Sequence, residues 1–439
     1  MLECIYNRAP VWVQNLMCSV KGWLLQRRRF GKGFFTELRR LEAREINPDA
    51  ELRSFLGAIR NVPAYRDLFS RVEQVEHRAA MLEDFPIINK AKVKERLDDY
   101  LNPDFHGPMF LNHTSGTTGS GIVFPNSVAY ENRQWATWWR YREELGIKFG
   151  TWCGWFGCAH MVVPINEKNA PYWRINRPGR QVMFSPYHLS ADTVGAYMDE
   201  IVRRKLTWVH GYASHIRFLA RLAIEKGLQP IEGVKFVTTG AENLLPAYVG
   251  DIKKVFPNAL VRTHYGQTEG VANFRMTKEG DWVVDEDFAK VEFIPYDEAN
   301  PERCRIVGTS FSNLAFPLVR YDIGDVAIVK WVDGKAKVVG IEGRENEYYI
   351  MKDGTKISTM RVYDIFKEAG NVVEAQLKIH GDDAVEMVVV KGEKFSNKDE
   401  REIFALAKKY LGEGIQTSIS YVDKIERTKS GKFRAIVKD

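Results

Sequence analysis

Two short segments, far apart in the sequence, carry the residue types that bind phosphate and a metal ion. Residues 113–121 read His-Thr-Ser-Gly-Thr-Thr-Gly-Ser-Gly, and residues 265–270 read Tyr-Gly-Gln-Thr-Glu-Gly. In the first segment, backbone N–H groups and hydroxyls can approach a phosphate closely, because glycine has no Cβ. In the second, the Glu269 carboxylate stands beside the Thr268 hydroxyl, and a carboxylate near bound phosphates indicates Mg²⁺. Together they indicate that a nucleoside triphosphate is bound without a Walker lysine.

The composition bounds the class of protein. The 439 residues, 45% hydrophobic and 27% charged, are typical of a globular chain of two or three domains. The net charge of +6 fits an anionic ligand but does not predict nucleic acid binding. Five irregularly spaced cysteines predict free thiols in a reducing, cytoplasmic compartment. Cys153, Cys158 and His160 are weak metal-ligand candidates, because no Cys-x-x-Cys pair or second cluster accompanies them.

The N-terminal apolar segment, residues 11–25, is interrupted by Gln14, Asn15 and Lys21, so we expect no membrane span. No basic region precedes it and no small-residue cleavage site follows it, which argues against a signal peptide. Three arginines follow at residues 27–29. We favour a helix packed on its own domain with a solvated basic end; contact of an amphipathic helix with anionic lipid is the alternative.

The alternation of helical and strand-like runs predicts a largely parallel sheet covered by helices. We expect helices at residues 34–60, 62–70 (with Pro63 as a suitable start), 135–145 and 191–205, and strands at residues 206–210, 234–240 and 259–264. In such sheets the ligand-binding loops lie at the carboxyl ends of the strands. The composition changes near residue 345, and a small α+β unit follows, with strands at residues 372–379, 385–390 and 416–422 and a helix at residues 397–411.

Together these motifs resemble the adenylate-forming superfamily, which includes acyl- and aryl-CoA ligases, luciferases and nonribosomal adenylation domains. Within it, the chain is most similar to phenylacetate–CoA ligase and to capsule-biosynthesis proteins of the CapK type. The resemblance implies an α/β fold: a large multi-layer adenylation domain with mostly parallel sheets, residues 1–344, and a small mobile α+β C-terminal domain, residues 345–439. It implies that ATP binds in the cleft between them.

The resemblance also assigns roles to the matching residues. Thr268 is implied to meet the α-phosphate, Glu269 to hold Mg²⁺, and Lys432 to reach the substrate carboxylate and the α-phosphate during adenylation. The implied nucleotide-binding residues are Thr114, Ser115, Gly116, Thr117, Thr118 and Gly119 in the phosphate loop, Gly240, Ala241 and Glu242 at the adenine turn, Tyr265, Gly266 and Gln267 beside the adenine, Asp325 at the ribose hydroxyls, and Arg344 near the ribose and phosphates.

Three segments depart from the family pattern. Ser120 and Gly121 stand where the phosphate loop usually continues with a lysine and a proline, and Ile323 replaces the threonine of the Tyr-x-Thr-Gly-Asp motif. At the hinge, residues 346–347 are Asn-Glu instead of two aspartates. We still expect the hinge there.

The acyl group is implied to lie between the segment after the first loop and the strand before the second. Trp155, Phe156 and Tyr212 are candidates for its apolar wall, and His160 for a hydrogen bond to it. The alternative is that these side chains belong to the core.

The implied activity is ATP- and Mg²⁺-dependent activation of a small carboxylic acid as an acyl-AMP, followed by transfer to CoA. Transfer to an amine, such as an amino sugar or amino acid in polysaccharide or natural-product biosynthesis, is the main alternative. A non-catalytic or carrier-docking protein that keeps the fold is the third hypothesis. Phenylacetate-type ligases are often dimers, so the resemblance also suggests a homodimer.

Overall fold

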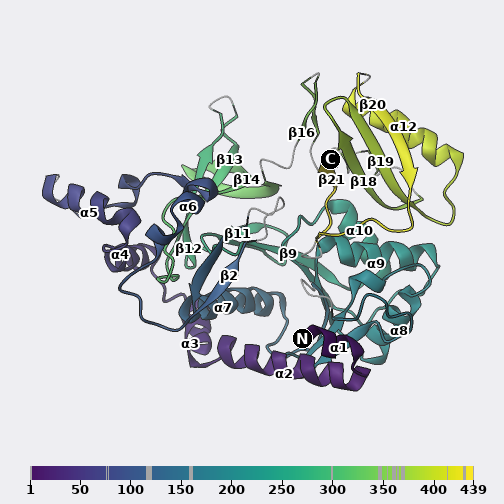
Figure 1. The fold of residues 1–439 in the computed structure, drawn as a ribbon, viewed down its shortest axis with the longest axis horizontal. Coiled ribbons are helices and arrows are strands. Elements are labelled where there is room, and N and C mark those ends of the chain that lie inside the picture. The colour runs from purple at the N-terminus through teal and green to yellow at the C-terminus, as the bar shows by residue number, and fades with distance from the viewer. Residues whose placement is uncertain are drawn as a thin grey trace.

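A central eight-stranded sheet organises the larger part of the protein (Figure 1). The computed structural model describes residues 2–75, 77, 79–114, 121–157, 162–297, 300–344, 349–352, 354–357, 362, 365–366, 371–412, 414–428 and 432–438. The strand order is β11-β10-β9-β8-β7-β4-β6-β5. Within the sheet, the strands that pair in parallel are β9 (Leu260–Gly266), β8 (Phe236–Thr239), β7 (Trp208–Gly211), β4 (Cys153–Phe156) and β6 (Gln181–Phe184). Antiparallel strands complete the sheet: β10 (Asn273–Met276) and β11 (Trp282–Val284) at one end and β5 (Trp173–Asn176) at the other.

Helices cover both faces of this sheet. Because alternate strand residues point to opposite sides, each strand can contribute to both of the cores beneath the helices. Val209 of β7 belongs to the core formed with α8 (Val194–Arg203), α9 (Ala213–Glu225) and α10 (Pro246–Val255). Trp208 packs on the other side, in the core formed with α7 (Val128–Leu145) and α3 (Lys32–Glu42). The carboxyl ends of β7, β8 and β9 therefore emerge between two layers of helices.

A second sheet is mainly antiparallel. Its order is β1-β14-β13-β12, with β15 also paired to β14. The strands are β1 (Ile88–Asn89), β12 (Ala289–Pro295), β13 (Arg303–Ser310), β14 (Tyr321–Val332) and β15 (Lys335–Arg344). Near it lie α4 (Pro48–Ala58), α5 (Pro63–Val75), α6 (Lys90–Glu95), and the hairpin of β2 (Met109–His113) and β3 (Val123–Ser127).

The C-terminal part has its own sheet and core (Figure 1, yellow). Its strand order is β20-β19-β18-β21. The strands are β18 (Val372–His380), β19 (Ala384–Lys391), β20 (Gln416–Tyr421) and β21 (Ile436–Lys438), and α12 (Asn397–Leu411) packs against them. A short pair, β16 (Tyr349–Ile350) and β17 (Lys356–Ile357), precedes them. At the N-terminus lie α1 (Leu2–Arg8) and α2 (Val11–Arg29).

The predicted α/β architecture with a small C-terminal α+β unit is confirmed, and α12 has the predicted bounds. Parallel pairing occurs in the central sheet, in two of the three strand pairings of the C-terminal sheet, and between β1 and β14. The single helix expected at residues 34–60 is wrong, because Asn47 and Pro48 begin a new helix there. The Asn47 side chain accepts hydrogen bonds from the N–H groups of Asp49 and Ala50, and Pro48 occupies the first helical position. Among the described helices, none is long and apolar enough to cross a bilayer.

Candidate active site

The predicted adenine turn and the Tyr265 segment lie side by side at the ends of β8 and β9. These strands are parallel neighbours in which Thr239 lies opposite Thr263. The residues that follow, Gly240 and His264, are therefore adjacent. A Cβ at position 240 would lie 2.7 Å from Cε1 of His264, so only glycine fits beneath this ring. The arrangement brings together two motifs that the sequence separates.

The adenine turn is conformationally strained and faces the C-terminal part of the chain. Ala241 has φ +64°, a left-handed conformation that is costly for a residue with a Cβ and is often found at functional sites. The Glu242 carboxylate accepts hydrogen bonds from the N–H of Ser214 at 3.0 Å and from the N–H of Phe433 at 3.2 Å. Glu242 thus links the start of α9 to the residue that follows Lys432.

The Lys432 backbone is hydrogen-bonded to Thr428 in the C-terminal tail. Its N–H donates to Thr428 Oγ1 and its carbonyl accepts from the N–H of Thr428, both at 3.0 Å. The neighbouring Phe433 packs against the core of the large sheet, with the Arg427 guanidinium 4.9 Å from its ring centroid. These contacts hold the Lys432 backbone beside the adenine turn.

Residues predicted to contact the adenine and the ribose come from two sheets. The Tyr265 hydroxyl donates to Oδ2 of Asp325 at 2.6 Å, and its ring stacks on Phe274 at 5.0 Å between centroids. Asp325, in β14, lies directly opposite Arg344 of β15. The strand ladder and one hydrogen bond therefore assemble Tyr265, Asp325 and Arg344 at one point.

Hydrogen bonds hold the segment that carries Thr268 and Glu269 in place. The Gln267 amide, oriented to face Ala272, donates to its carbonyl at 2.7 Å and accepts from its N–H at 3.0 Å. The Tyr130 hydroxyl donates to the Thr268 carbonyl at 3.5 Å. Burial, with the nearby Glu269 charge as a smaller cause, raises the pKa of Tyr130, which keeps this hydroxyl a neutral donor.

Glu269 is a buried carboxylate suited to a magnesium ion shared with a nucleotide. Its side chain accepts a hydrogen bond from the Tyr321 hydroxyl at 3.3 Å. Within the described part of the chain, no cluster of three or more His, Cys, Asp or Glu side chains could hold a metal. Mg²⁺ commonly binds one or two protein carboxylates and takes its other ligands from phosphates and water. The residues therefore fit Mg²⁺ held jointly with phosphates.

The base of the predicted phosphate loop is a closed hairpin. The Thr114 N–H donates to the carbonyl of Ile122, and Thr114 Oγ1 accepts from the N–H of Ile122, both at 3.0 Å. A Cβ at position 121 would lie 2.5 Å from the Thr114 carbonyl oxygen, which explains Gly121. Several predicted features lie outside the described residues: Ser115, Gly116, Thr117, Thr118, Gly119, Cys158, His160, the Arg344 side chain and the hinge pair at residues 346–347.

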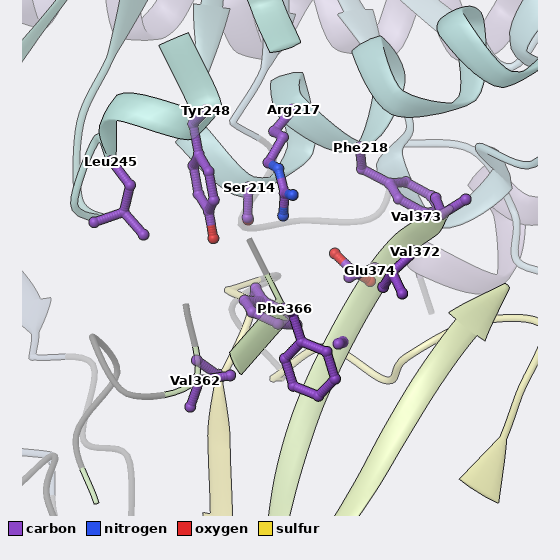
Figure 2. A pocket seen from close by; sticks show the side chains of 13 residues that line it. Ser214, Arg217, Phe218, Leu245, Tyr248, Val362, Phe366, Val372, Val373 and Glu374 are labelled. Atoms are coloured by element: carbon purple, nitrogen blue, oxygen red, sulfur yellow. The ribbon is translucent and has the colours of Figure 1, made fainter. Parts of the chain in front are cut away.

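A cleft runs between the large domain and the C-terminal sheet. It encloses about 600 Å³, part of it open to solvent. Figure 2 shows Arg217 and Tyr248 pointing from the α9 and α10 side toward the strand that carries Glu374. Phe433 also lines this cleft, so it adjoins the part of the tail that carries Lys432.

The three acyl-pocket candidates that the structure describes do not form one wall. Trp155 lies 4.7 Å from the His210 ring, on the α7 side of the sheet. Phe156 is fully buried on the opposite side, stacked on Phe184 at 4.7 Å, because neighbouring residues of a strand face opposite ways. Phe156 is therefore a core residue. Tyr212 precedes α9, with its ring 5.2 Å from that of His215.

The side of the sheet that carries Trp155 contains a polar aromatic cluster that sequence reasoning missed. His210 and His264 project from β7 and β9 with their rings 6.2 Å apart. Trp138 and Tyr141 of α7 lie 5.4 and 5.6 Å from His264. Nδ1 of His264 and the Tyr141 hydroxyl are buried, and neither has a hydrogen-bond partner within the described structure. From the sequence, the cluster could have been recognised only by the position of His264 directly before Tyr265 at a strand end.

Arg142 adds a buried positive charge behind this cluster. It is 3% exposed and lies over the rings of three tryptophans, with no carboxylate partner among the described residues. Burial lowers the pKa of Arg142 to about 10. Burial, followed by the Arg142 charge, lowers the pKa of His264 to about 3 and that of His210 well below its usual value. Both imidazoles are therefore neutral at pH 7.

Known proteins resemble this chain in both sequence and fold. Residues 349–439 match the family model of the CapK C-terminal domain. The chain is 24% identical to Protein CapK of Staphylococcus aureus over 99% of its own length and 98% of that protein.

Solved structures of 2-hydroxyisobutyryl-CoA ligase are also similar. In the postadenylation state with 2-HIB-AMP, the TM-score is 0.66 at 17% identity, covering 89% of this chain and 88% of the ligase. In the thioesterification state with 2-HIB-AMP and CoA, it is 0.50 at 18% identity, covering 94% and 91%. The resemblance predicted from the motifs is thus confirmed: the chain has the fold of the adenylate-forming ligases and a C-terminal domain of the CapK type.

Proposed function

We propose that this protein is an AMP-forming ligase that activates a carboxylic acid with ATP and transfers the acyl group to CoA. The observation that carries the proposal is the hydrogen bond from Tyr265 to Asp325, directly opposite Arg344 and next to the Glu269 segment. An aromatic ring and a carboxylate so placed suit a base and two ribose hydroxyls.

In the first half-reaction, a substrate carboxylate oxygen attacks the α-phosphorus of ATP, the bond to the pyrophosphate breaks, and acyl-AMP forms. The Thr268 hydroxyl would contact the α-phosphate, and Glu269 would hold Mg²⁺, which supplies charge neutralisation for the leaving pyrophosphate. Lys432 would bring a positive charge to the substrate carboxylate. In the second half-reaction, the CoA thiolate attacks the acyl carbonyl and AMP leaves.

The position of the C-terminal tail supports the assignment of Lys432 to the first half-reaction. The contact between Glu242 and Phe433 keeps Lys432 next to the adenine turn, as an adenylating arrangement requires. The higher similarity to the postadenylation state than to the thioesterification state of the neighbouring ligase agrees with it. We propose that residues 345–439 move as one body about the hinge at residues 346–347 between the two half-reactions.

The polar cluster beneath α7 suggests the class of acid. We place the acyl group over Gly240, against Trp155 and His264. A neutral imidazole and a phenol that have no hydrogen-bond partner among the described residues are costly to leave buried, so a substrate that pairs with them gains affinity. A small acid with a hydroxyl or amide group satisfies them, whereas phenylacetate offers no such group.

Hydroxylamine trapping tests the proposal directly. The protein, ATP and Mg²⁺ are incubated with aryl, hydroxy and amino acids, with and without CoA. We expect a hydroxamate with a small polar acid and a thioester when CoA is added. A hydroxamate without any thioester would move the acceptor to an amine. If no acid yields hydroxamate or ATP–pyrophosphate exchange although ATP binds, the ligase proposal fails.

A further inference from the structure

Helix α2 packs on the protein through its polar side. The Gln14 side chain is 3% exposed, accepts a hydrogen bond from Arg174, and donates to the carbonyls of Tyr6 and Ala9 at 3.0 and 2.9 Å. Asn15 Oδ1 accepts from the N–H of Ile175 at 2.8 Å. These amide side chains, which interrupt the apolar sequence, are therefore the ones that face inward.

The reason is that α2 covers an open sheet edge. Strand β5 ends the eight-stranded sheet, so within the described residues one side of its backbone lacks a strand partner. The Asn15 side chain accepts a hydrogen bond from the N–H of Ile175, and the Ser19 hydroxyl donates to the Ile175 carbonyl at 3.1 Å. Gly22 lies against Asn176 so closely that a Cβ would overlap its side chain. Covering an edge with polar side chains prevents unwanted strand pairing.

The apolar side of α2 consequently points into solvent. The exposed fractions of its large side chains are 69% for Trp12, 56% for Leu16, 52% for Val20, 48% for Trp23 and 57% for Leu24. Their spacing places them in one stripe along the helix. With a rise of about 1.5 Å per residue, the stripe is about 18 Å long. We call these five residues the α2 stripe.

The charges on helix α2 have one sign. Helix α2 contains no Asp or Glu. Lys21 is exposed, and the guanidinium of the exposed Arg27 lies 4.8 Å from the Trp23 ring centroid. Arg28 and Arg29, in contrast, turn inward to pair with Glu131. The exposed surface is therefore apolar, contains tryptophan at both ends, and has cations at its border.

We propose that the α2 stripe docks the protein onto an anionic lipid surface, with the helix lying parallel to the bilayer. Tryptophans and basic side chains around an apolar helix face are the features of interfacial helices. A second copy fits less well, because two such helices would face each other without any acidic residue to balance Lys21 and Arg27. Figure 1 shows α2 on the side of the molecule away from the C-terminal sheet, so docking leaves that sheet unobstructed.

The observed packing of α2 differs in one respect from the packing expected from the sequence. The helix does pack on its own domain, as favoured, but through Gln14 and Asn15, two of the three polar residues that interrupt the apolar segment; the third, Lys21, is exposed. The proposal goes beyond the ligase function and stands independently of it.

Co-sedimentation of the full-length protein with vesicles tests the proposal. We compare vesicles of phosphatidylcholine alone with vesicles containing phosphatidylglycerol. We expect binding at least tenfold tighter to the anionic vesicles, weakened by salt. The variant Trp12→Ser/Val20→Ser should lose at least tenfold in binding, and Lys21→Gln/Arg27→Gln should lose most of the preference for phosphatidylglycerol.

The matched control is Trp331→Ser/Val202→Ser, which removes a tryptophan and a valine that are 45% and 57% exposed elsewhere. It should bind vesicles like the unmodified protein. Equal loss in the control and the α2 variant, or no binding to either kind of vesicle, would overturn the proposal. A dimer that Trp12→Ser/Val20→Ser dissociates, without vesicle binding, would assign the stripe to a second copy. Acyl-AMP formation in solution should be the same for all variants, which separates this test from that of the ligase function.

Discussion

At the scale of single residues, Tyr265 links two halves of the candidate nucleotide site. Its hydroxyl is the only part of the side chain that Tyr265→Phe removes, while the stacking on Phe274 remains. A hydrogen bond to a charged group contributes about 1.5–3 kcal/mol, so we expect the KM for ATP to rise about tenfold or more. Because Asp325 would orient the ribose rather than the reacting atoms, kcat should change little.

Steady-state kinetics with varied ATP measure this effect. Tyr172→Phe is the control, since it removes a phenol that donates to the Lys168 carbonyl at 2.8 Å elsewhere. An unchanged KM for ATP in Tyr265→Phe would mean that the pair does not position the nucleotide.

His264 makes stability depend on pH. Its pKa of about 3 in the folded protein lies below the ordinary value of 6.5, so the unfolded chain binds the proton more readily. The stabilisation by the neutral ring is present above pH 6.5 and is lost as the pH falls toward 3. Between pH 7 and pH 5 the loss is about 2 kcal/mol for this residue.

Urea unfolding at pH 7 and pH 5 checks the size of this loss. His264→Gln should reduce the difference in unfolding free energy between the two pH values, whereas histidines that do not face residue 264 contribute equally to both proteins. An identical difference in the variant would show that His264 does not remain neutral when buried.

At the scale of elements, the glycine after Glu269 is needed for two reasons. Gly270 has φ +67°, and a Cβ there would lie 2.2 Å from the Tyr130 ring. We expect Gly270→Ala to destabilise the protein by more than about 2 kcal/mol and to lower kcat, because the segment carrying Glu269 must move. The measurements are urea unfolding and acyl-AMP formation.

Gly334→Ala separates the two causes. Gly334 has a similar φ of +73°, but no heavy atom lies within 4 Å of its hypothetical Cβ. It should cost only about 1–2 kcal/mol and leave activity intact. Equal effects of the two substitutions would mean that the Tyr130 ring moves aside at little cost and does not fix the segment that carries Glu269.

What the sequence predicts also depends on scale. Motif residues such as Tyr265 and Asp325 are recognisable because their types and order are informative, and the structure brings them together. Side-chain direction is harder to predict. Trp155 and Phe156 point to opposite faces of β4, and knowing which face borders α7 requires the packed sheet. Likewise, the polar side of α2 faces inward only because β5 leaves an open edge, which no local pattern reveals.

At the scale of the whole molecule, one carboxylate connects the two parts of the chain at the candidate site. Glu242 accepts from Ser214 of the large domain and from Phe433 of the C-terminal tail. Arg221 on α9 also donates to the Val372 carbonyl of β18 at 2.8 Å. Lys226, at the end of α9, pairs with Glu393 at 2.7 Å, and Lys424 donates to the Tyr187 carbonyl, so polar links recur along this interface. We propose that they break and re-form when the interface opens between half-reactions.

The division of labour between half-reactions gives the last prediction. Lys432→Ala removes the positive charge proposed to serve only acyl-AMP formation, so ATP–pyrophosphate exchange should fall at least 100-fold, a loss of about 2.7 kcal/mol in transition-state stabilisation. Thioester formation from supplied acyl-AMP and CoA should remain within about threefold of the unmodified rate, because that step has no use for the lysine once the tail has moved. Lys438→Ala, which removes a surface ion pair with Asp382 in the same tail, should leave both rates unchanged. If Lys432→Ala slowed the two half-reactions equally, the tail would be a fixed part of one site, and the proposed movement about residues 346–347 would be unnecessary.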